Sequence, residues 1–319
     1  MTAPVVVVRD LAVEFPGDPP VHAVRGVSFE VQRGERLGIV GESGCGKSVT
    51  AMSLLGLVDP PGRITAGSIT VDGRNMLTST PAELRALRGA TIAMIFQDPM
   101  TSLNPVFRIG YQIASVLEHH GWDDRRRRDA RVVELLRAVG IPDAERRVRA
   151  YPHELSGGMR QRVMIAMAIA NEPAVLVADE PTTALDVTVE AQIVLLLEDL
   201  ADRIGTAVVF ISHDLRLVSE LCDRVLVFYA GRIVEEGPIA EVFSNARHPY
   251  TRTLLELAFP SQDDGVRASI PASSHDVARP MEGCAFAPRC GYRTERCVEE
   301  PPLVGTSTHR AACWLEERA

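Results

Sequence analysis

The stretch Gly41–Ser48 has the residue types and spacing of a site for phosphate groups. Its sequence, GESGCGKS, fits the pattern G-x-x-x-x-G-K-[ST] and directly follows the apolar run Arg36–Val40. Glycines let a backbone curl so that successive N–H groups converge on one anion, and the positive end of a following helix adds to that attraction. Lys47 is expected to reach the β- and γ-phosphates of a nucleotide, and the Ser48 hydroxyl to bind Mg²⁺. The spacing therefore predicts that this stretch, the phosphate loop, binds a nucleoside triphosphate.

A second stretch could complete that site with carboxylates. The apolar run in AVLVADEP ends at Asp179, which Glu180 follows. Asp179 is expected to hold Mg²⁺ through water, and Glu180 to polarise an attacking water molecule. Acidic residues often follow strands, so this pair alone is a weak indication. Together with the phosphate loop, it predicts hydrolysis of the nucleotide.

Short apolar runs alternate with helical patterns along the chain, which predicts an α/β fold. Nearly continuous apolar runs suit strands covered on both faces of a mostly parallel sheet. The predicted strands are Val5–Val8, Arg36–Val40, Ala174–Ala178 and Ala207–Ile211. Apolar residues recur at helical spacing over 111–140, so a helical insertion is expected at about residues 104–157.

Composition limits the classes of function. The chain has 319 residues, 24% of them charged, and a formal net charge of −8. An acidic balance argues against a nucleic-acid binder that uses a basic face. The run Arg125–Arg128 is flanked by Asp123, Asp124 and Asp129, and is interpreted as a solvated helix surface. The sequence contains neither an apolar run long enough to span a bilayer nor a secretory signal, which favours the cytosol.

The stretch LSGGMRQR, Leu155–Arg162, identifies a family. With the other motifs in the expected order, residues from about Val5 to about Glu241 resemble the ATP-binding subunits of ABC transporters. The resemblance implies a P-loop NTPase fold, with an ABC nucleotide-binding domain over residues 1–258 and a helical subdomain at about 104–157. It also implies that ATP lies between two subunits arranged head to tail. Ser156, Gly157 and Gly158 would then meet the γ-phosphate held by the partner.

The resemblance implies roles for further residues. Gln97 in IFQDP matches the glutamine that senses Mg²⁺ and the attacking water and contacts the membrane subunit. Asp186 matches a residue that acts across the dimer, and His213 matches one that contacts the γ-phosphate. Phe15 is placed to stack on adenine, although an aromatic residue there could instead belong to the core. Met159 stands where the family more often has a glutamine, so the contact that this glutamine usually makes is not expected here.

These implied roles form three groups. The expected catalytic residues are Glu180, His213 and Gln97. The expected Mg²⁺ ligands are Ser48, Gln97 and Asp179. The residues expected to bind ATP are Phe15, Gly41, Ser43, Gly44, Cys45, Gly46, Lys47, Ser48, Val49, Gln97, Ser156, Gly157, Gly158, Asp179 and Asp186.

Several stretches are similar to the ATPases of peptide and oligopeptide importers: IFQDPMTSLNP, YPHELSGGMRQRVMIAMAIA, YAGRIVEEG and RHPYT. This resemblance implies an ATPase that drives peptide import from the cytoplasmic face of the membrane, where it is peripheral. The implied partners are two transmembrane permease subunits, a second and different ATPase subunit, and an extracytoplasmic solute-binding protein.

Other functions remain alternatives. Similar systems carry nickel chelates or glutathione in place of peptides. A soluble ABC ATPase acting on nucleic acid is disfavoured, because that class tends to carry two cassettes, long coiled-coil insertions or basic tails.

Four of the six cysteines, Cys284, Cys290, Cys297 and Cys313, lie in residues 259–319, which are expected to form a linker (259–283) and a small C-terminal extension. The stretch GCAFAPRC reproduces a pattern of the importer ATPases, some of which hold a [4Fe-4S] cluster there. Structural zinc sites usually present two cysteines that are two to four residues apart, and this spacing is absent here. A four-iron cube tolerates more open loops, so a [4Fe-4S] cluster is expected, with zinc, disulfides or buried thiols as alternatives. Cys222 is interpreted as a small buried residue, and Cys45 as a small residue that fills a variable position of the phosphate loop, with oxidation that blocks ATP binding as the alternative.

Overall fold

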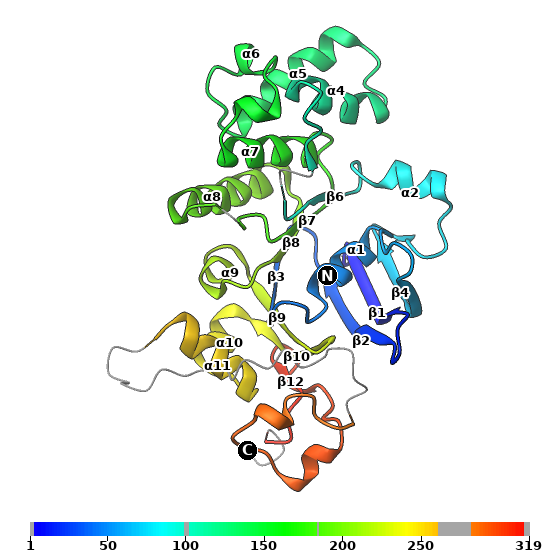
Figure 1. Ribbon diagram of the computed structural model, residues 1–319, viewed down its shortest axis with the longest axis vertical. Coiled ribbons are helices and arrows are strands. Elements are labelled where there is room, and N and C mark those ends of the chain that lie inside the picture. The colour runs from blue at the N-terminus through cyan, green and yellow to red at the C-terminus, as the bar shows by residue number, and fades with distance from the viewer. Residues whose placement is uncertain (1–2, 99–101, 184, 261–281, 316–319) are drawn as a thin grey trace. The chain divides into compact units, whose positions relative to one another are not determined.

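A computed structural model (Figure 1) describes residues 3–98, 102–183, 185–260 and 282–315. Most of the predicted linker, 259–283, lies outside these ranges. The chain divides into two compact units, which are described separately. Unit 1 comprises Met1–Val6, Val31–Glu35 and Val71–Val209, and unit 2 comprises Val7–Glu30, Arg36–Thr70 and Phe210–Ala319.

Unit 1 contains most of the helices in the middle of the chain. Its elements are β5 (Arg74–Asn75), α2 (Pro81–Leu87), β6 (Ile92–Ile95), α4 (Ile109–His119), α5 (Arg125–Ala138), α6 (Ala144–Arg147), η1 (Pro152–Glu154), α7 (Gly157–Ala168), β7 (Val175–Asp179) and α8 (Val187–Ile204). The next strand, β8 (Ala207–Ile211), runs from unit 1 into unit 2.

Unit 2 contains the strands and helices at both ends of the chain. Its elements are β1 (Val6–Phe15), β2 (Val21–Val31), β3 (Arg36–Val40), α1 (Lys47–Leu54), β4 (Arg63–Val71), α9 (Leu215–Leu221), β9 (Arg224–Tyr229), β10 (Arg232–Pro238), α10 (Ile239–Ser244), α11 (Pro249–Ala258), η2 (Ala287–Arg289), η3 (Glu295–Val298), β11 (Val304–Gly305) and β12 (Arg310–Ala311).

Strand β7 of unit 1 is buried along its whole length, as the apolar run predicts for a strand covered on both faces. It pairs in parallel with β6, and the register places Ile92 opposite Val175 and Ile95 opposite Ala178. Helix α7 contacts β6 and α8. The strand therefore delivers its last residue, Asp179, to the carboxyl edge of a parallel pair, where ligands of open α/β sheets bind.

The predicted helical stretch over 111–140 forms two helices, α4 and α5, which pack on each other and on α7 (Figure 1). The break follows from local sequence. Gly121 takes a positive φ of 86°, and the Asp124 carboxylate caps α5 by accepting the N–H groups of Arg126 and Arg127 at 2.8 and 3.1 Å. Arg125–Arg127 are exposed in the first turn of this capped helix, as predicted, whereas the Arg128 side chain is only 13% exposed and donates to the Trp122 carbonyl oxygen at 3.1 Å.

Two sheets build unit 2. In one, β3 pairs in parallel with β9, β9 pairs antiparallel with β10, and β10 pairs antiparallel with β12, which also pairs with β11. In the other, β2, β1 and β4 are neighbours in that order. The C-terminal residues therefore extend the sheet whose strand β3 leads into the phosphate loop.

Helix α9 packs closely on β3. A Cβ atom on Gly38 would lie 2.5 Å from the Val218 side chain and 3.3 Å from the Cys222 sulfur. Burial raises the pKa of the Cys222 thiol, and the prediction of a small buried residue there is confirmed. Within the described ranges, no helix is long and apolar enough to cross a membrane.

Candidate nucleotide site and cysteine cavity

The phosphate loop connects β3 to α1 in unit 2, as the sequence predicts. Two of its glycines are required by close backbone approach: a Cβ atom on Gly41 would collide with the Phe228 carbonyl oxygen, and one on Gly46 with the Ala23 carbonyl oxygen. Both also have positive φ values, 151° and 104°. This curled backbone precedes the positive end of α1, the arrangement that concentrates N–H groups on an anion.

Lys47 folds back over the phosphate loop. Its Nζ donates to the carbonyl oxygens of Gly41 at 2.8 Å and Glu42 at 3.0 Å, and the side chain is buried. Neutral carbonyl groups hold the ammonium here, and a phosphate oxygen would be a stronger, charged acceptor. The geometry suits a lysine that exchanges loop carbonyls for a phosphate.

Other predicted site residues of unit 2 lie in the phosphate loop and the first turn of α1. Ser43, Gly44 and Ser48 are exposed, and Val49 is half-buried in the first turn of α1. Cys45 is buried, and burial raises the pKa of its thiol, so its reading as a small buried residue is confirmed. Exposed Ser48 offers a hydroxyl oxygen, a donor that Mg²⁺ accepts.

Two further residues of unit 2 were expected to contact ATP. Phe15 ends β1, is half-buried, and its ring lies against Gly62. His213 is exposed after β8, just before the α9 N-cap residue Asp214. Burial by itself would raise the pKa of Asp214, but hydrogen bonds from the Arg216 side chain and backbone outweigh it, so the pKa is lowered.

Unit 1 brings two predicted catalytic residues together. The Gln97 amide Nε2 donates to Glu180 Oε2 at 3.0 Å, and Thr183 Oγ1 donates to the same oxygen at 3.0 Å. Glu180 has a positive φ of 45°, which is uncommon for a residue with a side chain and concentrates at functional sites. Thr183 carries no motif signal, so the sequence gave no reason to expect it. The carboxylate thus accepts hydrogen bonds from Gln97 and Thr183 at a strained turn directly after β7.

Asp179 is buried at the end of β7, 4% exposed. A buried carboxylate favours a cationic partner, and its oxygen suits Mg²⁺. The donor types of Asp179, Gln97 and Ser48 therefore fit the predicted ion.

The stretch Leu155–Arg162, which identified the family, contains the start of α7, also in unit 1. The Ser156 hydroxyl caps the helix by accepting the Met159 N–H at 3.3 Å. A Cβ atom on Gly158 would lie 2.8 Å from the Val189 side chain in α8. Asp186 caps α8 through the Val189 N–H at 3.0 Å. Two capped helix starts thus lie close together, and the first N–H groups of a helix have no partner within it.

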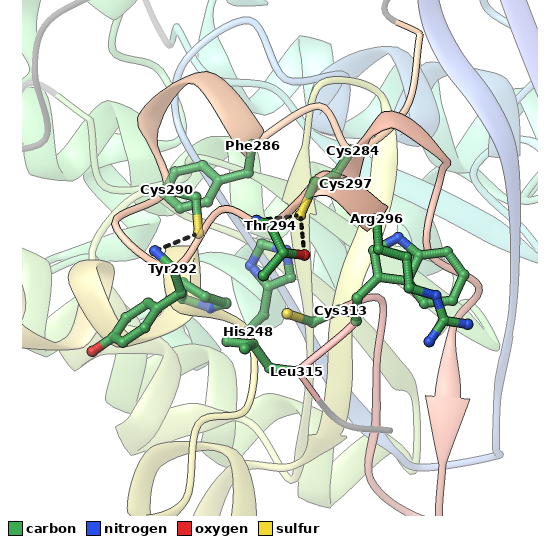
Figure 2. Close-up of a pocket in the computed structure, with 12 residues that line it drawn as sticks. His248, Cys284, Phe286, Cys290, Tyr292, Thr294, Arg296, Cys297, Cys313 and Leu315 are labelled. Carbon is green, nitrogen blue, oxygen red and sulfur yellow. Dashed lines mark hydrogen bonds between the residues drawn. The ribbon is translucent and has the colours of Figure 1, made fainter. Parts of the chain in front are cut away.

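The four C-terminal cysteines line one cavity of about 60 Å³ in unit 2 (Figure 2). Within the described residues, no group of three or more His, Cys, Asp or Glu side chains is placed to hold a metal ion. All six cysteines are free thiols. Burial raises the pKa values of Cys284 and Cys290, and raises that of Cys313 to about 11. The four cysteines therefore share a cavity, and the [4Fe-4S] cluster stays a prediction.

Sequence reasoning missed how the C-terminal residues meet the phosphate loop. The Glu42 N–H donates to the Tyr250 hydroxyl at 2.9 Å, and the Glu42 carboxylate accepts two hydrogen bonds from Arg289. Tyr250 lies in RHPYT and Arg289 in GCAFAPRC, two stretches that the sequence marked only by family resemblance. Their place in these two stretches was the sequence signal that could have pointed to a role for Tyr250 and Arg289.

Comparison with known proteins agrees with this architecture. The family model described as "ABC transporter" matches residues 24–183, and that described as "Oligopeptide/dipeptide transporter, C-terminal region" matches residues 234–297. A probable peptide ABC transporter ATP-binding protein of Sinorhizobium fredii is 50% identical over 96% of this chain and 93% of the relative. An oligopeptide transport ATP-binding protein of Bacillus subtilis is 48% identical over 97% of this chain and 88% of the relative.

A solved structure with the same fold is a dimeric ATP-binding cassette in a post-hydrolysis state, bound to ADP and phosphate. It is 28% identical, has a TM-score of 0.65, and the match covers 73% of this chain and 98% of that chain.

Proposed function

Because this chain belongs to the ATP-binding proteins of ABC transporters, we propose that it hydrolyses ATP to drive the import of peptides across a membrane. The observation that carries the choice of peptides is the match of residues 234–297 to the C-terminal region of oligopeptide and dipeptide transporters. Relatives with peptide transport in their names align over nearly the whole chain, which supports the same choice.

The roles of the nucleotide-site residues follow from their chemistry. The N–H groups of the phosphate loop and the Lys47 ammonium bind the phosphates. Ser48, Gln97 and Asp179 would hold Mg²⁺, which would supply positive charge to neutralise the phosphates. Glu180 accepts a proton from the attacking water, and the hydrogen bond from Gln97 orients its carboxylate for that task.

The remaining site residues act at the edges of the nucleotide. His213 contacts the γ-phosphate, and Phe15 stacks on the base, since a π-face against an adenine ring is favourable.

The functional unit is a dimer in which each ATP meets two subunits. The capped start of α7 supports this, because Ser156 and the following glycines offer helix N–H groups to an anion. The dimeric form of a cassette with the same fold supports it as well. The second subunit is a different ATPase of the same family, and Asp186 acts across the interface.

The dimer docks on two permease subunits at the cytoplasmic face of the membrane, and an extracytoplasmic solute-binding protein delivers the peptide. Exposed apolar side chains close to Gln97 in the sequence support the docking: Phe96, Val106 and Phe107 are 38%, 70% and 44% exposed. Apolar side chains gathered on a surface mark protein contacts.

The cysteine cavity holds a [4Fe-4S] cluster. Four thiols around one cavity are the ligand set of such a cluster. Structural zinc sites usually present two cysteines that are two to four residues apart, and these four cysteines lack that spacing, which favours the cluster over zinc. Anaerobic purification followed by a visible spectrum and by iron and zinc analysis tests this. Colourless protein loaded with zinc would contradict it.

Transport in proteoliposomes tests the main proposal. The complete complex, with ATP on the side of this subunit, is expected to accumulate labelled di- and oligopeptides. The same complex with Lys47→Ala is expected to accumulate none, because the phosphates lose their ammonium partner. Transport of nickel chelates or glutathione without any transport of peptides would overturn the choice of substrate.

A further inference from the structure

The strongest contact between the C-terminal extension and the phosphate loop is a forked ion pair. Arg289 Nη1 donates to Glu42 Oε2 at 2.9 Å, and Nη2 donates to Oε1 at 2.7 Å. The arginine side chain is only 6% exposed, and the carboxylate side chain is 35% exposed. Bidentate pairs of this kind are strong and fix orientation, because both nitrogens of the planar fork must align with both oxygens.

Aromatic rings hold Arg289 in place. Its guanidinium lies 5.7 Å from the centre of the Tyr229 ring and 5.9 Å from that of Phe286, and Nη1 also donates to the Tyr229 hydroxyl at 3.3 Å. Phe286 in turn packs on Tyr229 and Tyr250, with ring centres 5.3 and 5.5 Å apart. Since these contacts lock the arginine, the ion pair costs little side-chain entropy on forming.

The N–H, the carbonyl and the carboxylate of Glu42 each take part in a hydrogen bond. Its N–H donates to the Tyr250 hydroxyl, its carbonyl accepts from Lys47, and its carboxylate binds Arg289. The residue directly follows Gly41, where the loop begins to curl. Fixing Glu42 therefore fixes the path of the backbone whose N–H groups meet the phosphates.

Charge gives the pair a second effect. Without Arg289, the Glu42 carboxylate would place an uncompensated negative charge in a loop that must receive a polyanion. Removing one partner of a partly buried pair also deprives the other of these hydrogen bonds. Both consequences weaken the binding of a triphosphate.

We propose that Arg289 is a positioning residue for ATP binding: acting through Glu42, it holds the phosphate loop in its binding conformation and cancels the charge of that carboxylate. The extension is thereby part of the nucleotide site, although it touches no phosphate. The inference depends on ATP binding at the loop and is independent of the transported substrate.

Binding of a fluorescent ATP analogue to the full-length protein tests this. Arg289→Met is expected to raise the Kd roughly five- to tenfold, within the usual range of coupling between sites. Arg293→Met removes the same charge from an exposed position in the same extension and is expected to leave the Kd unchanged. In the assembled ATPase, Arg289→Met is expected to raise KM for ATP by a similar factor and to change kcat less than twofold, because the residue does not touch the reacting atoms.

The double variant separates positioning from general damage. With Glu42→Gln in place, Arg289→Met is expected to change the Kd less than about twofold, because coupled residues are non-additive. An equal loss of affinity in both backgrounds would overturn the proposal, as would an unchanged Kd in Arg289→Met. Should Arg289→Met fold poorly, Arg289→Lys replaces it: the charge stays, the fork is lost, and an intermediate Kd is expected. A Kd equal to that of the unmodified protein would then overturn the proposal.

Discussion

Tyr250→Phe removes one oxygen atom and tests how firmly the C-terminal region holds the phosphate loop. Tyr250 is fully buried, and burial raises the pKa of its hydroxyl, which therefore stays protonated. The hydroxyl accepts the Glu42 N–H at 2.9 Å. Phenylalanine fills the same volume, so no cavity forms, and the change isolates this one hydrogen bond.

The expected loss follows from the geometry. A protein hydrogen bond contributes about 1 kcal/mol net, and a buried donor left without a partner costs about 1–3 kcal/mol. The Glu42 N–H is partly buried, so a fall of about 1–2 kcal/mol in the free energy of unfolding is expected. ATP affinity should fall as well, because the same N–H orders the loop.

Urea titration of the full-length protein measures this change. The midpoint should fall while the slope of the transition stays constant, since the exposed surface of the unfolded state is unaltered. Tyr292→Phe is the matched control: Tyr292 is 58% exposed in the same extension, and its loss of a hydroxyl should cost less than about 0.5 kcal/mol. Equal midpoints for the two variants would refute the role assigned to the hydroxyl.

Three further predictions use other parts of the site. Gly46→Ala should abolish ATP binding and lower the midpoint of thermal unfolding, because the new Cβ atom collides with the Ala23 carbonyl oxygen and alanine disfavours the positive φ of this position. Calorimetric scans with and without ATP measure both effects, and scans equal to those of the unmodified protein would contradict the reasoning. Thr183→Val should lower ATP turnover roughly three- to tenfold with little change in ATP affinity, since it removes the hydrogen bond that Thr183 donates to the Glu180 carboxylate. An unaltered kcat would show that this hydrogen bond does not orient the carboxylate. Asp214→Asn should lower the free energy of unfolding at pH 7, because the folded-state pKa of Asp214 is lowered. This loss of stability should be complete above the unfolded pKa of about 3.9 and should vanish as the pH falls through the lower folded pKa. A loss of stability that does not change with pH would argue against this reasoning.

Much of the nucleotide site could be predicted because its signals are local. The strand before the phosphate loop, the glycines within it and the lysine after it lie in one stretch, and the structure places β3, the loop and α1 there in that order. Ser156 and Asp186 were assigned to the ATP site from family resemblance, and both prove to cap helices through neighbouring backbone N–H groups. Short-range chemistry determines such features.

Other features depend on contacts that the sequence does not encode locally. Glu42 and Arg289 are 247 residues apart, and only the folded sheet brings them together. The left-handed backbone at Glu180 is imposed by its surroundings, since nothing in a glutamate favours a positive φ. Family resemblance predicted a metal site at the four C-terminal cysteines. They line one cavity, but no group of described residues is placed to hold a metal ion.

The measurement that tests the account most directly is ATP hydrolysis and peptide uptake by the reconstituted complex carrying Glu180→Gln. Glutamine has the size of glutamate, and its carbonyl oxygen can accept the hydrogen bonds from Gln97 and Thr183, but it cannot take a proton from water. ATP binding should persist, while hydrolysis and uptake should both fall by about 10²–10⁴-fold, the usual contribution of a general base. Hydrolysis at the wild-type rate in that complex would contradict the central claim that Glu180 activates water to power import.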